Sequence, residues 1–165
     1  MKLHSQLIKS LLLLIISAGI IACSSEQEST NKPPASDDSR VLEYSRELTF
    51  LDTEGNAVST IDVAIADDDS ERAQGLMDVK KMPTESGMLF IFPDEQARSF
   101  WMANTPLPLD ILYVAADSTI VRIYTQTRPY SQESLPSGSA AKFVVEVNGG
   151  YTINRDIREG YRIRF

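Results

Sequence analysis

The distribution of apolar residues after residue 42 restricts the fold more than any other feature of this sequence. Apolar residues there occur in short runs or alternate with polar residues, and turn-forming residues separate the runs. Such a pattern indicates short β-strands rather than long helices. Residues 43–165 comprise about 120 residues, which is a usual length for one domain. We therefore expect a single globular domain that is rich in β-structure.

The expected strands follow one another closely along the chain. Two alternating segments, 48–50 and 61–65, flank a turn at 52–56 and are expected to form a hairpin. A continuous apolar run at 87–92 predicts a buried strand. Further strands are expected at 99–102, 109–114, 119–124, 142–147 and 161–165. The fold class is thus α+β and β-rich, with a compact barrel-like or rolled antiparallel sheet and one or two short helices.

One segment has the signals of a helix. Asp68 and Glu71 have the spacing of a capping box, in which each residue satisfies a free backbone N–H of the first turn. Three apolar residues within 73–77 then fall on one helical face. A second short helix is expected within 150–157. Both helices are small beside the predicted sheet, so they should cover it only in part.

The start of the chain has the pattern of a secretory signal. Lys2 and Lys9 precede an apolar run at 11–16, and a small residue precedes Cys23, the only cysteine of the chain. A cysteine at this cleavage position resembles the lipobox of bacterial lipoproteins. An uncleaved membrane anchor needs about 20 apolar residues, more than segment 11–22 offers. An ordinary signal peptide would not need the cysteine.

The lipobox predicts a three-part chain. Residues 1–22 would be the signal peptide, 23–42 the lipidated Cys23 with a disordered tether poor in apolar residues, and 43–165 the globular domain. Acyl chains on Cys23 would insert into the membrane. An Asp directly after the lipidated cysteine would favour retention in the inner membrane. The residue at this position is Ser24, which favours the outer membrane. We expect a cell-envelope protein that is lipid-anchored and faces the periplasm.

Processing would also restrict the chemistry of the mature protein. His4, the only histidine, lies in the signal peptide, and acylation would occupy Cys23. The mature chain would then lack serine or cysteine nucleophiles activated by histidine, His/Cys zinc sites and an internal disulfide. Loss of Lys2 and Lys9 takes the formal net charge from −7 to −9, which argues against nucleic acid as a partner. No cofactor is predicted.

Five short motifs in the globular part carry a family resemblance. They are Gly75-Leu76-Met77, Gly87-Met88-Leu89-Phe90, Phe100-Trp101-Met102-Ala103-Asn104-Thr105, Pro108-Leu109-Asp110 and Glu146-Val147-Asn148-Gly149-Gly150. In this order they resemble the domain-of-unknown-function family 192 (DUF192) over roughly residues 46–165. The family commonly has a basic residue at position 103 and Ala at position 149. The resemblance implies a compact β-rich domain, and it implies no activity.

Asp110 and Glu146 are the candidate catalytic residues. Each lies among apolar residues of a predicted strand, and a buried carboxyl must be paired or protonated. Pairing with Arg72 or Arg98 would be purely structural. Together the two carboxyls would instead suit acid–base hydrolysis of an envelope glycan. We favour the structural interpretation and leave the other open.

The segment after Trp101 is the region that we expect to form a binding site. Asn104 and Thr105 lie close to two prolines in a stiff loop, where their polar groups either hold backbone or line a pocket beside Trp101. The candidate ligand-binding residues are Trp101, Asn104, Thr105, Asp110 and Arg72.

Methionines near Trp101 raise a metal hypothesis. Met77, Met88 and Met102 are soft ligands of the kind that select Cu(I). Methionine and tryptophan also pack well in cores, and without histidine a thioether site would be weak. The function expected is therefore a non-catalytic binding or accessory module for a small ligand or an envelope protein. Glycan hydrolysis and Cu(I) binding are the alternatives, and whether the domain is an enzyme stays open.

Overall fold

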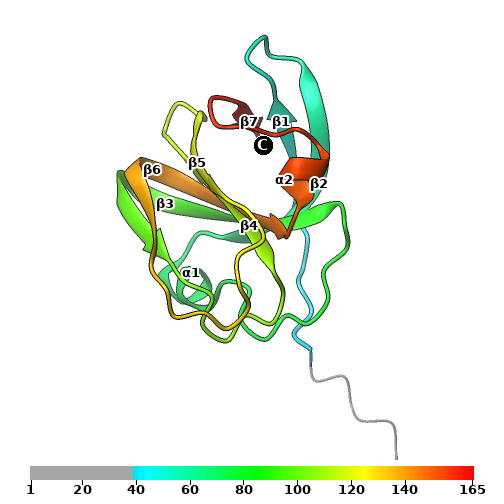
Figure 1. The fold of residues 1–165 in the computed structure, drawn as a ribbon, viewed down its shortest axis with the longest axis vertical. Helices are drawn as coiled ribbons and strands as arrows, with labels where there is room; N and C mark the ends of the chain where they lie inside the picture. The colour runs from blue at the N-terminus through cyan, green and yellow to red at the C-terminus, as the bar shows by residue number, and fades with distance from the viewer. Residues whose placement is uncertain (1–38) are drawn as a thin grey trace, which may run out of the picture. The chain divides into compact units, whose positions relative to one another are not determined.

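The computed structural model describes residues 39–165, and the predicted signal peptide, Cys23 and most of the predicted tether lie outside them (Figure 1). Seven strands and two short helices form the described part, which confirms the expected β-rich rolled fold. Neither of these helices has the length and hydropathy of a membrane span. The elements are β1 (Arg46–Leu51), β2 (Ala57–Ala66), α1 (Asp69–Gln74), β3 (Ser86–Phe100), β4 (Leu109–Val114), β5 (Ile120–Tyr124), β6 (Leu135–Asn148), α2 (Tyr151–Asn154) and β7 (Arg162–Arg164).

All strands belong to one curled sheet with the order β5-β4-β6-β3-β2-β1-β7. Neighbouring strands are antiparallel except β2 and β3, which are parallel because α1 and its loops carry the chain across between them. The two ends of the sheet meet. The Ile120 N–H donates to the carbonyl of Tyr161 and the Ile163 N–H to that of Ser118, which joins the β5 side to β7. The sheet is thus curled into the half-barrel visible in Figure 1.

Two apolar clusters pack against the two faces of this sheet. The inner cluster collects residues from all seven strands and α2, so it fills the inside of the curl. The outer cluster lies on the opposite face and takes residues from β2, β3, β4 and β6 and from the turn after α1. Strand β4 contributes to both clusters, and all six of its residues are buried. Its continuous apolar sequence follows from burial on both faces.

Helix α1 is shorter than the sequence predicted. The capping box of Asp68 and Glu71 is present, as expected. The helix ends at Gln74 because Gly75 adopts φ +48°, a left-handed conformation that glycine tolerates best. The predicted apolar face therefore breaks at Gly75, and Leu76 and Met77 lie in the turn that follows. No residue within α1 itself is buried.

Two strands are longer than predicted. Strand β3 unites the expected strands at 87–92 and 99–102, and β6 begins at Leu135, well before the expected 142–147. The two strands pair with each other at both ends of β3 and are irregular between. Exposed residues at 93–97, of which only 94–96 are polar, concealed this continuity, because apolar periodicity marks a strand only where a face is buried. Helix α2 also ends early, at Asn154.

The chain already contacts the domain from residue 39 onward. The Lys80 N–H donates to the Ser39 hydroxyl at 3.0 Å, and the Arg40 N–H donates to the carbonyl of Asp78 at 3.2 Å. The Arg40 guanidinium donates to the carbonyl of Gly75 at the end of α1. Residues 39 and 40, within the predicted tether, thus hold the segment after α1. The domain boundary after residue 42 stays a prediction.

Candidate functional site

A pocket of about 250 Å³ lies on the outer face of the sheet, between the end of α1, the end of β3 and the loop after Trp101. Its wall receives residues from segments 75–77, 87–90, 100–105 and 146–150. Four of the five motifs in the sequence therefore meet at one place. Segments far apart in the chain converge there because β3 pairs with β6, and Leu76, just after α1, packs in the outer cluster with Phe90 of β3. This pocket is the candidate functional site.

Glu146 is the unusual residue of the pocket. It lies on β6 between Met88 of β3 and Ile111 of β4, and only 4% of its surface is exposed. Within residues 39–165, no side chain or backbone group forms a hydrogen bond or ion pair with its carboxyl. Burial alone raises the pKa of Glu146 to about 8. At pH 7 the carboxyl is thus mainly protonated and presents a hydrogen-bond donor to the pocket.

Arg72 lines the same pocket, but its guanidinium forms no ion pair with the Glu146 carboxyl. Its guanidinium donates to the Ile91 carbonyl at 2.8 Å, to the carboxylate of Asp69 at 2.6 Å and to the carbonyl of Asp67. These bonds fasten α1 to β3. Because burial is the only cause of the raised pKa, no cationic side chain offsets the desolvation of the Glu146 carboxyl.

Trp101 also lines the pocket and is its accessible aromatic side chain. It is the only tryptophan of the chain, directly follows β3, and is 58% exposed. The next residue, Met102, is buried, and its sulfur accepts a hydrogen bond from the Thr127 hydroxyl at 3.1 Å. The buried neighbour fixes the backbone, so Trp101 is held at the surface beside the pocket.

The loop after Trp101 is fastened to both sides of the pocket. The Thr105 N–H donates to the carbonyl of Met102, and the Thr105 hydroxyl donates to that of Ala103 at 3.2 Å. Asn104 has φ +53°, and its carbonyl accepts the Asp78 N–H at 2.9 Å. Thr105 lines the pocket, whereas Asn104 is exposed and ties the loop to the segment after α1. The Thr105 side chain thus both holds backbone and lines the pocket, whereas Asn104 ties the loop through its backbone carbonyl.

Asp110 lies away from this pocket. In the β4–β6 register it opposes Val147, whereas Glu146 opposes Ile111, so the two carboxyls point to opposite faces of the sheet. Asp110 is fully buried. Its carboxylate accepts the N–H groups of Gln126, Gly150 and Thr152 at 2.7–2.8 Å and the Thr152 hydroxyl at 2.6 Å. These bonds hold the start of α2.

The arginines proposed as partners of these acids bind elsewhere. Arg98 donates to the carbonyl of Ala141 at 2.8 Å and to the carboxylate of Asp94 at 2.9 Å. Backbone and hydroxyl donors satisfy Asp110 instead of a cation. The structure therefore brings together Trp101, Thr105, Arg72 and Glu146 from the predicted site residues, and it places Asp110 on the other face.

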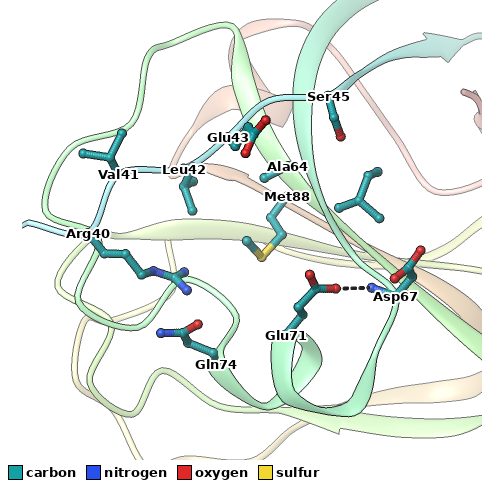
Figure 2. A pocket seen from close by; sticks show the side chains of 11 residues that line it. Arg40, Val41, Leu42, Glu43, Ser45, Ala64, Asp67, Glu71, Gln74 and Met88 are labelled. Atoms are coloured by element: carbon teal, nitrogen blue, oxygen red, sulfur yellow. Dashed lines mark hydrogen bonds between the residues drawn. The ribbon is translucent and has the colours of Figure 1, made fainter.

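The three methionines do not line one cavity. Met77 lines the candidate pocket, Met102 is buried in the outer cluster, and Met88 lines a second hollow of about 470 Å³ (Figure 2). Figure 2 shows this hollow between residues 40–45 and α1, where the Glu71 carboxylate accepts the Asp67 N–H at 3.1 Å. Residues 39–165 contain no cluster of three or more His, Cys, Asp or Glu side chains suited to a metal. Cu(I) binding stays a prediction.

Some pocket residues were not predicted from the sequence. Phe90 and Phe100 form part of the wall and contact each other edge to face, with ring centroids 5.0 Å apart. In the sequence they are apolar residues of strands, which is also how core residues appear. Nothing in the sequence indicated that Gln74 and Ser99 line a pocket, because exposed polar residues are usual on any surface.

The comparisons with known proteins agree with the motifs. The model of the family DUF192, described as "Uncharacterized ACR", matches residues 50–165. A protein of Sinorhizobium meliloti 1021 that bears the name "putative transcription regulator" is 32% identical, with a TM-score of 0.71 over 76% of this chain and 97% of its own. A protein of unknown function from Novosphingobium aromaticivorans is 26% identical, with a TM-score of 0.69 over 78% and 96%. No curated protein matches the chain.

Proposed function

Because this chain belongs to the DUF192 family, whose description states no activity, we propose from its pocket that it is a binding module for a small ligand. One observation carries the proposal. Glu146, of which 4% is exposed and whose carboxyl has no partner among the described residues, lies in the wall of the same pocket as Trp101, which is 58% exposed. A ligand between these two side chains would contact a polar group and an aromatic face at once.

A ligand in the pocket would interact favourably with both residues. The Glu146 carboxyl has no hydrogen-bond partner among the described residues, and a ligand atom that bonds to it would add a hydrogen bond that contributes about 0.5–1.5 kcal/mol, or about 1.5–3 kcal/mol if a charged group takes part. An exposed tryptophan gains from covering its apolar surface. The pocket volume, about 250 Å³, is just below the usual range of roughly 300–1,000 Å³ for ligand sites. It therefore suits a small molecule or one side chain of a partner protein.

Binding is better supported than two-carboxylate hydrolysis. Glycosidases of that class place two carboxyls within about 10 Å across the scissile bond. Glu146 is the one carboxyl among the described residues that line the pocket. Asp110 faces the inner cluster and already accepts four hydrogen bonds, so it has little capacity left to act on a substrate.

We also propose that the binding domain is held at the cell envelope by a lipid on Cys23. The support is the sequence: the basic start, the short apolar run and the cysteine agree with a lipoprotein signal. Ser24 favours the outer membrane, with the domain in the periplasm. The acyl chains would provide the membrane contact, since the formal net charge of −9 after removal of Lys2 and Lys9 does not favour an acidic lipid surface.

A fragment screen tests the binding proposal. Backbone amide NMR of the labelled protein is recorded with a panel of cationic, anionic and neutral fragments at millimolar concentration. Fluorescence of Trp101, the only tryptophan, reports on the same pocket. We expect shifts to concentrate at 75–77, 100–105 and 146. The absence of any pocket response across the whole panel would contradict the proposal.

A matched pair of variants shows whether the pocket is responsible. Trp101→Ala should weaken binding about tenfold or more, since an aromatic contact contributes about 0.5–1.5 kcal/mol beyond its buried area. Ile153→Ala is the control, because Ile153 is similarly exposed (60%) but lies on α2 outside the pocket. Equal affinity of the two variants would place the binding site elsewhere.

A further inference from the structure

The surroundings of Glu146 indicate the charge of the ligand. Two titratable side chains lie near it: Tyr113 of β4, whose pKa is affected by Glu146, and Arg72 of α1, which lines the same pocket. Tyr113 is neutral, because burial raises its pKa, and its hydroxyl donates to the carbonyl of Leu135. The guanidinium of Arg72 is bonded to Asp69 and to backbone carbonyls. On β3 the neighbour in register is Met88, which has no charge. Among the described residues, therefore, none supplies a cation to the Glu146 carboxyl.

The aromatic part of the pocket wall is suited to a cation, and Arg72, the cationic side chain in the wall, is already paired with Asp69. Phe90, Phe100 and Trp101 line it with Glu146. The faces of aromatic rings attract organic cations, and tryptophan attracts them most strongly. A carboxylate forms charge-assisted hydrogen bonds with an ammonium or guanidinium group, which are stronger than those of a neutral acid. The chain is also acidic overall, with a formal net charge of −7, which favours the approach of cations.

On the premise of the proposed binding function, we infer that the ligand is an organic cation, whose primary ammonium or guanidinium group pairs with Glu146 while its apolar part lies against Trp101. Entry of the cation removes the proton from Glu146. The neutral carboxyl and the cation become a carboxylate–cation pair, and the proton leaves to solvent. A free amine and a lysine or arginine side chain of an envelope protein share this chemistry.

The proton release gives the inference a signature in the pH dependence. Only the ionised form of Glu146 pairs with the cation, so the apparent affinity is reduced by the ionised fraction. Because the pKa of Glu146 is about 8, this fraction rises about tenfold per pH unit between pH 6 and 7 and then levels off above pH 8. A neutral ligand that accepts a hydrogen bond from the protonated carboxyl would show the opposite trend.

The test compares 2-phenylethylammonium with its neutral analogue 2-phenylethanol. Dissociation constants for the full-length chain in non-ionic detergent are measured by Trp101 fluorescence between pH 6 and 8.5, where this amine stays protonated. Calorimetry in two buffers of different ionisation enthalpy counts the protons released. A capped Phe-Lys dipeptide, carrying the same ammonium on a peptide, distinguishes a free amine from a protein side chain by its relative affinity.

The expected results separate the cation from other ligands. The ammonium should bind about thirtyfold or more tightly at pH 8 than at pH 6, with up to one proton released. Glu146→Gln should abolish this pH dependence and weaken the ammonium about tenfold or more at pH 8, while 2-phenylethanol is unaffected. Tighter binding of 2-phenylethanol, or ammonium affinity that is flat or falls with pH, overturns the inference and leaves the binding function standing. No pocket response to any fragment of the panel overturns both.

Discussion

Replacing Glu146 with Gln should stabilise the protein at neutral and alkaline pH, because it removes a carboxyl whose ionisation the fold opposes. Glutamine has nearly the same volume and is neutral at every pH, so it preserves the packing between Met88 and Ile111. Only 4% of Glu146 is exposed, so solvent screens the effect little.

The magnitude follows from the pKa of Glu146, which burial raises from the ordinary value of 4.5 to about 8. A raised folded-state pKa means that the folded protein binds the proton more tightly than the unfolded chain does. The stabilisation that comes from this tighter proton binding is fully present below pH 4.5 and is lost as the pH rises to 8. Each pH unit in this window costs about 1.4 kcal/mol, and the whole window costs about 5 kcal/mol. Total stabilities are about 5–15 kcal/mol, so the effect is large.

The assay is urea denaturation followed by circular dichroism at pH 5, 6, 7 and 8. The stability advantage of Glu146→Gln over the wild type should grow by about 1.4 kcal/mol per pH unit, or about 4 kcal/mol over the series. Glu47→Gln, which removes an exposed carboxyl from β1, corrects for the loss of one surface charge. An advantage that stays constant within about 0.5 kcal/mol across the series would refute the reasoning, given that one protonation step requires the slope above.

Three further predictions concern other parts of the chain. Gly87→Ala should destabilise the fold by about 3 kcal/mol in thermal unfolding, since the added Cβ would lie 2.5 Å from the Glu146 carbonyl oxygen; unchanged stability would contradict this close approach. Asp110→Asn should lower the free energy of unfolding by about 3 kcal/mol, because an amide cannot accept all four hydrogen bonds. Fragment binding by the folded variant should persist, and loss of binding with unchanged stability would instead assign Asp110 to the binding site. Cys23→Ser should abolish incorporation of labelled palmitate and release the protein from membranes; retained label would disprove the lipid anchor.

The parts of the fold that the sequence predicts well are those with strong local signals. Strand β4 was predicted at residues 109–114, because burial on both faces makes its sequence continuously apolar. The capping box of Asp68 and Glu71 is a local pattern that needs no tertiary context. The length of β3 and the parallel pairing of β2 with β3 depend on partners distant in sequence, so local periodicity could not reveal them.

The candidate site shows the same division between local and distant information. The sequence suggested Trp101, Thr105, Arg72 and Glu146 one at a time, and the tertiary fold brings them to one pocket. Asp110 and Glu146 look alike in sequence, since each is an acid on an apolar strand. Their separation depends on the register between β4 and β6, where a shift of one residue would reverse the face that each occupies. That register is fixed by the whole sheet.

The central claim is that Glu146 is a protonated, unpartnered acid in the pocket at neutral pH. Its most direct test is a carbon-13 NMR titration of the Glu146 side-chain carboxyl, assigned by comparison with Glu146→Gln. The account predicts a midpoint at about pH 8, the value to which burial raises its pKa. A midpoint near the ordinary value of 4.5 would contradict it, because the carboxyl would then be ionised and stabilised by contacts that the structure does not contain among residues 39–165.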